Sequence, residues 1–363
     1  MTKGHVGIVE RLVERFDRVI VLPCYLSPHK IGRHSGGGEH RIKMLRLALG
    51  RLGVRVGGVN GLVSTPAGLV IDGRELDRGG VSYTVDTIRE LRGEYPNDEL
   101  WFVVGGDSLA ALHTWYNWDE LRGLCNFLVV GRDKWVIDDI RLDGTIVELA
   151  DFVGEDVSSS YARVLNAVGR IDEAVPKSVA EYIKSSGLYN DYRYIADRYN
   201  DYGLSPRRIA HTVRAAKEAV DLAKVHRESI SDSIIATMLH DIAKDMDIVG
   251  YDDVPKPCRH ALIGAKIALR DFGVSEDIAK AIAQHTTGAP NMSRLAKIVY
   301  LADYIEIGRA MDGLGEVRQA AYKDLDIAMH LALGKTLRHL RESGGRIDQN
   351  TIRAWEWYDG NRH

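Results

Sequence analysis

The hydrophobic pattern changes character about halfway along the chain, and this change limits the possible folds more than any other feature. In the first half, short apolar runs alternate with amphipathic segments. The runs at 18–24, 100–107 and 126–132 are continuous, as in strands buried inside a parallel sheet, while 54–63 and 145–151 are weaker candidates. Because the segments between them have helical periodicity, the pattern predicts a doubly wound parallel α/β sheet.

The second half has almost no strand signal. From about residue 190, six amphipathic segments follow one another, and their connections carry Gly, Pro and Asn, so this half is predicted to be an all-α bundle. The pattern breaks at 187–193, which places the predicted domains at 1–189 and 190–363. Ordinary domain sizes allow two domains in 363 residues.

Composition narrows the function classes. The net charge of −3 gives no global attraction to nucleic acid or to an anionic membrane. Hydrophobic residues make up 45% of the chain, yet no apolar run approaches the roughly 20 residues of a membrane span. The three cysteines are far apart and form no disulfide framework. We therefore expect a cytoplasmic protein with no nucleic-acid or membrane partner, for which an oligomer is allowed.

A candidate phosphate site opens the chain at Thr2-Lys3-Gly4-His5, directly before a predicted helix. A helix N-terminus presents free N–H groups and a partial positive charge, so it favours a phosphate. Gly4 would let the phosphate approach the backbone, and His5 would donate a hydrogen bond to one of its oxygens. An ordinary helix start explains the same residues, so the string alone leaves both interpretations open.

Further candidates lie near the carboxyl ends of the predicted strands, where open α/β sheets bind ligands. Lys30 follows the first strong strand, Gly106-Asp107 ends the second, and Trp115 lies shortly beyond. Ser158–Ser160 begin another predicted helix, with Arg163 one turn inside it. The structural alternatives are a solvated loop lysine, a helix N-cap and a core tryptophan.

These elements resemble a known family when they are taken together. The segments TKGH, LSPHK, HRIKMLRLAL, SYTVDTIRELRGEYPNDELWFVVGGD, WYNWDEL, VSSSYAR and VPKSVAEYIKSSGLY keep the order found in bacterial nicotinate-nucleotide adenylyltransferases, over about residues 2–189. The resemblance implies a Rossmann-like nucleotidyltransferase that joins ATP and nicotinate mononucleotide into deamido-NAD, releases pyrophosphate and uses Mg²⁺. Pantetheine-phosphate adenylyltransferase, which shares this fold, is the alternative enzyme, and an inactive nucleotide-binding module is the alternative of another class.

The resemblance also implies site residues. The residues expected at ATP are Thr2, Gly4, His5, Gly106, Asp107, Ser159 and Arg163, with His5 as a catalytic residue. The residues expected at nicotinate mononucleotide are Lys30, Ser82, Tyr83, Thr84 and Trp115.

The chain departs from this family at its beginning. Family members start with a buried strand and a glycine-rich turn before the signature, whereas this sequence starts inside the signature at Met1-Thr2. We therefore expect the first strand of the adenylyltransferase-like domain to be missing, an upstream reading frame that encodes it, and weak or absent transferase activity in the 363-residue form.

A second candidate site lies in the helical half. His240 and Asp241 are adjacent in a segment that is otherwise apolar, where unpaired polar side chains would be costly to bury. A metal ion would offset that cost, because imidazole nitrogens and carboxylate oxygens are metal ligands. Four more such residues lie on neighbouring predicted helices and suggest convergence on one pocket: His211, His260, His285 and Asp303.

This half resembles HD-domain phosphohydrolases. The segments HDIAKD, HALIGA, AQHTTG and ADYIEIGR match most closely the branch that hydrolyses diadenosine tetraphosphate symmetrically to ADP, over about residues 192–350. The resemblance implies two metal ions, with iron as the expected metal and Asp241 as the bridging, catalytic ligand. It implies one metal at His211, His240, Asp241 and Asp303, and a second at His260 and His285.

Two basic residues near this metal-ligand set are candidates for holding the outer phosphates. Lys244, one turn after the dyad, is also a candidate catalytic residue, and Arg309 follows the last of the aspartates. Surface charge is the alternative explanation for each. The functional alternative for this half is another HD nucleotidase or phosphodiesterase.

Overall fold

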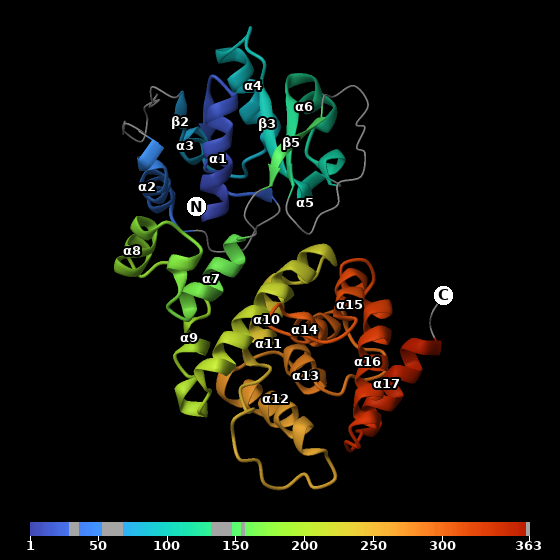
Figure 1. Ribbon diagram of the computed structural model, residues 1–363. Coiled ribbons are helices and arrows are strands. Elements are labelled where there is room, and N and C mark those ends of the chain that lie inside the picture. Colours follow the sequence, from blue (N-terminus) through green and yellow to red (C-terminus); the bar gives the residue numbers. More distant parts are fainter. Residues whose placement is uncertain (29–35, 53–67, 110, 132–146, 154–156, 361–363) are drawn as a thin grey trace. The chain divides into compact units, whose positions relative to one another are not determined.

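The computed structural model describes residues 1–28, 36–52, 68–109, 111–131, 147–153 and 157–360 (Figure 1). The chain divides into two compact units, residues 1–162 with 172–189, and residues 163–171 with 190–363. The boundary between 189 and 190 stays a prediction. Along the described ranges, no helix is both long and apolar enough to cross a membrane.

The described strands of the first unit pair in parallel, as the continuous apolar runs predict. Within the described residues they form two ladders, β1–β2 and β3–β4–β5. Their bounds are Val19–Val21 for β1, Leu69–Ile71 for β2, Trp101–Gly105 for β3, Asn126–Gly131 for β4 and Val147–Val153 for β5. β1 is shorter than its apolar run, because Pro23 cannot donate a ladder hydrogen bond. The weak candidate at 54–63 lies outside the described residues.

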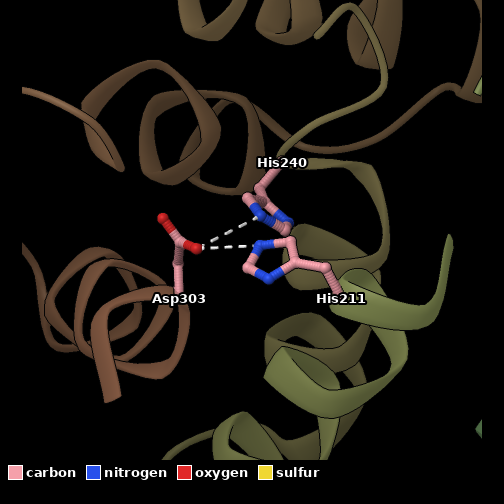
Figure 2. A group of neighbouring side chains, drawn as sticks. All are labelled: His211, His240 and Asp303. Carbon is pink, nitrogen blue, oxygen red and sulfur yellow. Dashed lines mark ion pairs between the residues drawn. The ribbon is translucent and has the colours of Figure 1, made fainter. Parts of the chain in front are cut away.

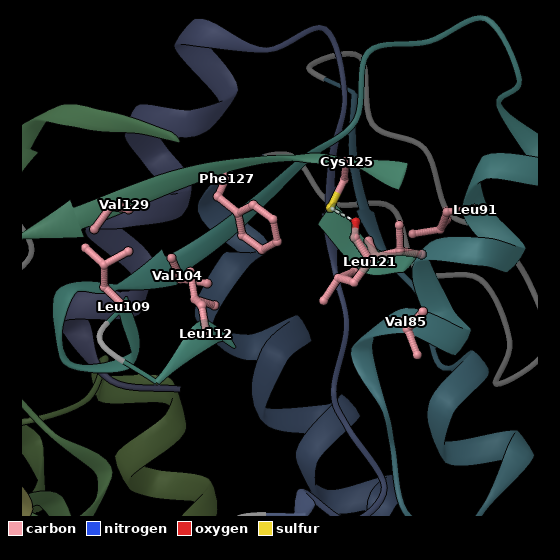
Figure 3. Close-up of a cluster of buried hydrophobic side chains, with 10 residues drawn as sticks. Val85, Leu91, Val104, Leu109, Leu112, Leu121, Cys125, Phe127 and Val129 are labelled. Carbon is pink, nitrogen blue, oxygen red and sulfur yellow. Dashed lines mark hydrogen bonds between the residues drawn. The ribbon is translucent and has the colours of Figure 1, made fainter. Parts of the chain in front are cut away.

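Helices alternate with these strands. They are α1 (Lys3–Arg15), α2 (Gly38–Leu49), α3 (Arg74–Arg78), α4 (Thr84–Glu94), α5 (Gly106–Leu109), α6 (Trp118–Leu124), α7 (Ser159–Ala167) and α8 (Lys177–Ser185). The core joins α4 and α6 to one face of β3 and β4 (Figure 3). Val85 and Leu91 from α4 and Leu121 from α6 pack there against Val104 and Phe127. Burial of each such side chain stabilises the fold by about 1.5–3 kcal/mol.

The second unit consists of helices and their connections, with no strand among its described residues, as predicted. They are α9 (Arg193–Ala196), α10 (Pro206–Val225), α11 (Ile230–Leu239), α12 (Arg259–Phe272), α13 (Glu276–Gln284), α14 (Arg294–Ile305), α15 (Leu314–Ala321), α16 (Leu325–Glu342) and α17 (Gln349–Gly360). Serine side chains cap several N-termini: Ser205, Ser275 and Ser293 each accept a hydrogen bond from the backbone N–H three residues later.

The long α10 organises this bundle by packing against both α11 and α14, and α13 packs against α11, α12 and α14. The dyad His240-Asp241 does not lie inside a helix as the sequence suggested. α11 ends at Leu239, and the two residues occupy the turn directly after it. This turn frees their side chains from the helical register and lets both reach the interior.

Candidate metal centre and nucleotide site

Six metal-ligand side chains of the helical unit come from five helices or their ends. His211 lies on α10, His260 on α12 and Asp303 on α14, while the dyad follows α11 and His285 caps the end of α13. The four histidines and Asp241 are buried.

Backbone hydrogen bonds fix the tautomers of two of these histidines. Nδ1 of His240 lies 2.6 Å from the carbonyl oxygen of Thr237, and Nδ1 of His285 lies 2.7 Å from that of Ile282. Because a carbonyl oxygen only accepts, Nδ1 carries the proton in both rings. In the neutral form of such a ring the lone pair lies on Nε2, and Nε2 of His240 is buried without a hydrogen-bond partner among the described residues. This is the donor state that binds a metal ion.

The first cluster joins His211, His240 and Asp303 (Figure 2). Oδ1 of Asp303 lies 2.9 Å from Nε2 of His211 and 3.9 Å from Nε2 of His240. Oδ2 of Asp241 lies 3.7 Å and 3.5 Å from the same two nitrogens. Two imidazole nitrogens and two carboxylate oxygens therefore face one another in a small volume.

The second cluster contains His260 and His285, and the carboxylate of Asp241 lies against both this cluster and the first. Nε2 of His260 and Nε2 of His285 lie 3.1 Å apart. The other oxygen of Asp241, Oδ1, lies 3.1 Å from the first of these nitrogens and 3.6 Å from the second. Each oxygen of this carboxylate thus faces a different pair of histidines, which is the arrangement of a ligand that bridges two cations.

The protonation states suit a divalent metal. Burial lowers the pKa of His240 to about 4, and burial lowers that of His260 to about 4 as well, so both rings are neutral at pH 7. Burial opposes ionisation of Asp241 and Asp303, but the neighbouring histidines outweigh it and hold both pKa values well below the usual range. His211 differs, because burial opposes its charge but Asp303 and Glu306 outweigh burial and raise the pKa of this ring, so a metal ion would have to displace a proton there. Neutral imidazoles and ionised carboxylates are hard-to-borderline ligands, so these residues fit iron, manganese or zinc.

Both basic residues proposed from the sequence lie at this cluster. Nζ of Lys244 lies 3.2 Å from Nε2 of His260, and burial lowers the pKa of this lysine. Arg309 donates through Nη2 to Oδ1 of Asp303 at 2.5 Å. Lys244 is thus half-buried beside the second cluster, whereas Arg309 is 40% exposed and held by its ion pair with Asp303.

Two charged residues at the site escaped the sequence reasoning. Arg208 donates through Nη1 to Oδ2 of Asp241 at 2.7 Å. Glu306 is 1% exposed and lies 3.2 Å from Nδ1 of His211. The sequence offered one signal for them, their spacing from a metal-ligand residue on the same helix or at its end. Arg208 lies three residues before His211, and Glu306 lies three residues after Asp303.

In the first unit, the start of α1 holds the candidate phosphate-binding residues. Thr2 is the N-cap, and its backbone N–H donates to Nδ1 of His5 at 3.3 Å, with its hydroxyl 2.6 Å from the same atom. Because an N–H only donates, Nδ1 accepts and Nε2 carries the ring proton. His5 is exposed while Thr2 and Gly4 are buried. This tautomer is the one that can donate to a phosphate oxygen.

Three of the residues expected at the pyridine nucleotide, Ser82, Tyr83 and Thr84, lie at the start of α4. Ser82 is buried and accepts a hydrogen bond from the Tyr25 backbone N–H at 2.9 Å, and Thr84 is the first residue of the helix. The ring of Tyr83 lies 4.5 Å from that of Tyr116. Trp115 is half-buried, with its ring 5.8 Å from Phe102 and edge-on to it.

The remaining expected residues are placed as follows. Gly106 begins α5 directly after β3, and Ser159 begins α7. Arg163 forms an ion pair with Asp191 at 2.7 Å. Lys30 and the side chain of Asp107 lie outside the described residues.

Comparison with known proteins assigns each half to a family. A model of the cytidylyltransferase-like family matches residues 1–165. A probable nicotinate-nucleotide adenylyltransferase of Geobacter sp. (strain M21) is 34% identical over 217 residues, which cover 52% of this chain and 93% of the relative. The first half of the chain belongs to the nicotinate-nucleotide adenylyltransferase family. A probable enzyme of the same name from Streptococcus pneumoniae serotype 4 is 34% identical over 176 residues, covering 48% of this chain and 75% of the relative.

An HD domain follows the adenylyltransferase-like unit, since the HD family model matches residues 208–308. That range contains all six clustered ligands as well as Lys244. The suspected fusion of two families is therefore confirmed.

Two solved structures resemble parts of the chain. A predicted HD superfamily hydrolase involved in NAD metabolism, from Clostridium acetobutylicum, is 34% identical and covers 46% of this chain and 97% of its own, with a TM-score of 0.43. Plasmodium falciparum nicotinic acid mononucleotide adenylyltransferase complexed with NaAD is 17% identical and covers 52% and 92%, with a TM-score of 0.42. Because both TM-scores are below 0.5, these likenesses carry no further argument.

Proposed function

We propose that this chain is a bifunctional enzyme. Its first unit transfers the adenylyl group of ATP to nicotinate mononucleotide, and its HD domain hydrolyses diadenosine tetraphosphate to two ADP. The observation that carries the hydrolase assignment is the carboxylate of Asp241, whose two oxygens face two different histidine pairs. Family membership over 93% of a relative named as an adenylyltransferase supports the transferase assignment.

In the adenylyl transfer, a phosphate oxygen of nicotinate mononucleotide forms a bond to the α-phosphorus of ATP, and the bond to the β-phosphate oxygen breaks, releasing pyrophosphate. No covalent enzyme intermediate is needed, so the protein acts by positioning and by charge neutralisation. His5, with its ring proton on Nε2, donates to a phosphate oxygen, and the N-terminus of α1 adds its free N–H groups. Mg²⁺ would neutralise further charge on the triphosphate.

In the HD domain, His211, His240, Asp241 and Asp303 would hold one metal ion, and His260 and His285 with Asp241 a second. A bound pair of metal ions, with iron as the proposed metal, would supply an activated water and stabilise the entering and leaving oxygens. Lys244 and Arg309 bind the phosphates flanking the central bridge, where they neutralise charge on the departing ADP. The water oxygen bonds to phosphorus, the central bridging bond breaks, and each product is ADP.

Two assays on the intact protein test these activities separately. Pyrophosphate release from ATP should require nicotinate mononucleotide and should not occur with phosphopantetheine. Metal-loaded protein should convert diadenosine tetraphosphate to ADP alone, as resolved by chromatography of the products. A panel of mononucleotides, cyclic nucleotides and dinucleoside polyphosphates identifies the preferred substrate, and a cyclic or monophosphate substrate turned over faster would refute the proposed hydrolase.

A further inference from the structure

Arg208 makes an ion pair that metal binding would disturb. It lies in the first turn of α10, one turn before His211, and its Nη1 donates to Oδ2 of Asp241 at 2.7 Å. Its side chain is 26% exposed. Nε is buried and has no hydrogen-bond partner among the described residues, and the nearest oxygen of Asp245 is 4.0 Å away. The guanidinium therefore uses little of its donor capacity within the protein.

A permanent cation at this position opposes the binding of a metal ion. Arginine does not lose its proton in proteins, so Arg208 competes with a divalent cation for Asp241 and repels it at short range. The same conflict holds for Arg309 on Asp303 and for Lys244 beside His260. Three positively charged side chains, from three segments of the chain, therefore lie beside residues that would hold the metal ions.

An anionic ligand resolves this conflict. When metal ions take the oxygens of Asp241, the fork of Arg208 is released next to them, and its parallel N–H donors match two oxygens of a phosphate. A single phosphate group would be bound by the metal ions themselves. Additional side-chain cations on several sides of the site would instead stabilise a ligand that carries more negative charge than one phosphate.

We propose that Arg208 binds phosphate oxygens of the substrate and, with Lys244 and Arg309, makes the HD site select a chain of several phosphates over a single phosphate. This inference rests on the proposed two-metal site and deepens it. Arg208 is then a specificity-determining residue. Its ion pair with Asp241 forms when no phosphate chain is bound.

A structural role for Arg208 makes a different prediction. If the guanidinium served only to anchor Asp241, its removal would loosen that carboxylate and weaken metal binding. The chain offers a matched control in Arg207, the same residue type in the same turn, which is exposed and makes no hydrogen bond or ion pair to any residue that the structure describes. Glutamine at either position keeps the helix and most of the side-chain length.

The test compares Arg208→Gln and Arg207→Gln with the unmodified protein by calorimetry. Each is first titrated with Mn²⁺ alone. After removal of excess metal, each is titrated with inorganic tripolyphosphate and, separately, with orthophosphate. The variant Asp241→Asn, which lacks the bridging carboxylate, serves as the blank for anion binding elsewhere, including at the adenylyltransferase unit.

We expect Arg208→Gln to bind Mn²⁺ at least as tightly as the unmodified protein, and to bind tripolyphosphate at least ~10-fold more weakly, because a hydrogen bond to a charged group is lost. Its orthophosphate affinity should change by less than ~3-fold, and Arg207→Gln should behave as unmodified protein throughout. An equal loss for both anions, or a loss of Mn²⁺ affinity, would overturn the inference. Failure of diadenosine tetraphosphate hydrolysis would reject the proposed substrate while this binding result still stands.

Discussion

Glu306 holds the imidazole of His211 through Nδ1, at 3.2 Å from Oε1 of the carboxylate. The same carboxylate accepts hydrogen bonds from Nε of Arg214 at 2.6 Å and from the backbone N–H of Gly308 at 2.5 Å. Burial opposes its ionisation, but these donors outweigh it and hold the pKa of Glu306 below its ordinary value. With Nδ1 bonded to this carboxylate, Nε2 of His211 faces Asp303 and is the ring nitrogen available to a metal ion once its proton leaves.

We therefore predict that Glu306→Ala weakens metal binding by about 10- to 100-fold, because the His211 ring loses its orientation and basicity. Glu306→Gln, whose amide oxygen can still accept from Nδ1, should lose less. A Mn²⁺ titration of the intact protein measures both. The control is Glu316→Ala on α15, whose carboxylate pairs with Lys335 at 3.3 Å. Unchanged Mn²⁺ affinity in Glu306→Ala would contradict this role.

Asp241 should be the least replaceable residue of the helical unit. We predict that Asp241→Ala abolishes both bound metal and hydrolysis, because it removes the one carboxylate that faces both histidine pairs. Adenylyl transfer should be unchanged, since the residues expected at that site, apart from Arg163, lie in the other compact unit. Metal analysis and both activity assays check this, with the exposed Asp247→Ala as control. A variant with near-normal metal and turnover would show that the site has been misplaced.

The strongest sequence signals were those set by burial. The run containing β4 is continuous and apolar because both faces of this strand are buried, so a strand could be predicted there from the residues alone. The equally apolar run containing β3 also forms a strand, although most of its side chains are only half-buried. Clustered histidines in apolar helices pointed to a metal centre for the same reason: burial of unpaired polar groups is costly.

Arg208 and Glu306 could not be found in that way. A charged residue on a helix is ordinarily solvated, and only tertiary packing brings these two to Asp241 and His211. The end of α11 at Leu239 was also missed, because the apolar pattern continues through Ile242 and Ala243 and gives no stop signal.

Trp115 tests the assignment of the pyridine nucleotide pocket. We predict that Trp115→Ala raises the KM for nicotinate mononucleotide by roughly 5- to 10-fold and that for ATP much less, because an aromatic platform for the pyridine ring is lost. Its ring also packs edge-on against Phe102, so the alanine variant loses core contacts too. Trp115→Phe keeps an aromatic face and should recover most of the affinity.

Steady-state kinetics with each substrate varied in turn separate the two effects of Trp115→Ala. Trp118→Phe provides the control, since Trp118 packs on Phe127 in the core at 5.3 Å and should alter stability without a selective change in either KM. If Trp115→Ala changed the KM for ATP more than the KM for nicotinate mononucleotide, this side chain would belong to the ATP site.

Cys125 makes the stability of the first unit sensitive to alkaline pH. It is buried beside Leu121 and Phe127, and burial raises the pKa of its thiol to about 12. An unfolded chain ionises this thiol near pH 9, so above that pH the folded state binds more protons than the unfolded state. Stability is therefore fully present below pH 9 and is lost as the pH rises toward 12.

Between pH 8 and pH 10, Cys125 should lower the free energy of unfolding by about 1.4 kcal/mol. This is the value for one pH unit, from pH 9 to pH 10, over which the thiol is ionised in the unfolded chain but not in the folded protein. Urea unfolding followed by tryptophan fluorescence measures it in a Trp355→Phe/Trp357→Phe background, where all remaining tryptophans lie in the first unit. Cys125→Ala should be less stable at pH 8 but should lose about 1.4 kcal/mol less than its parent on going to pH 10. Parallel losses in the two proteins would mean that the thiol already ionises in the folded state.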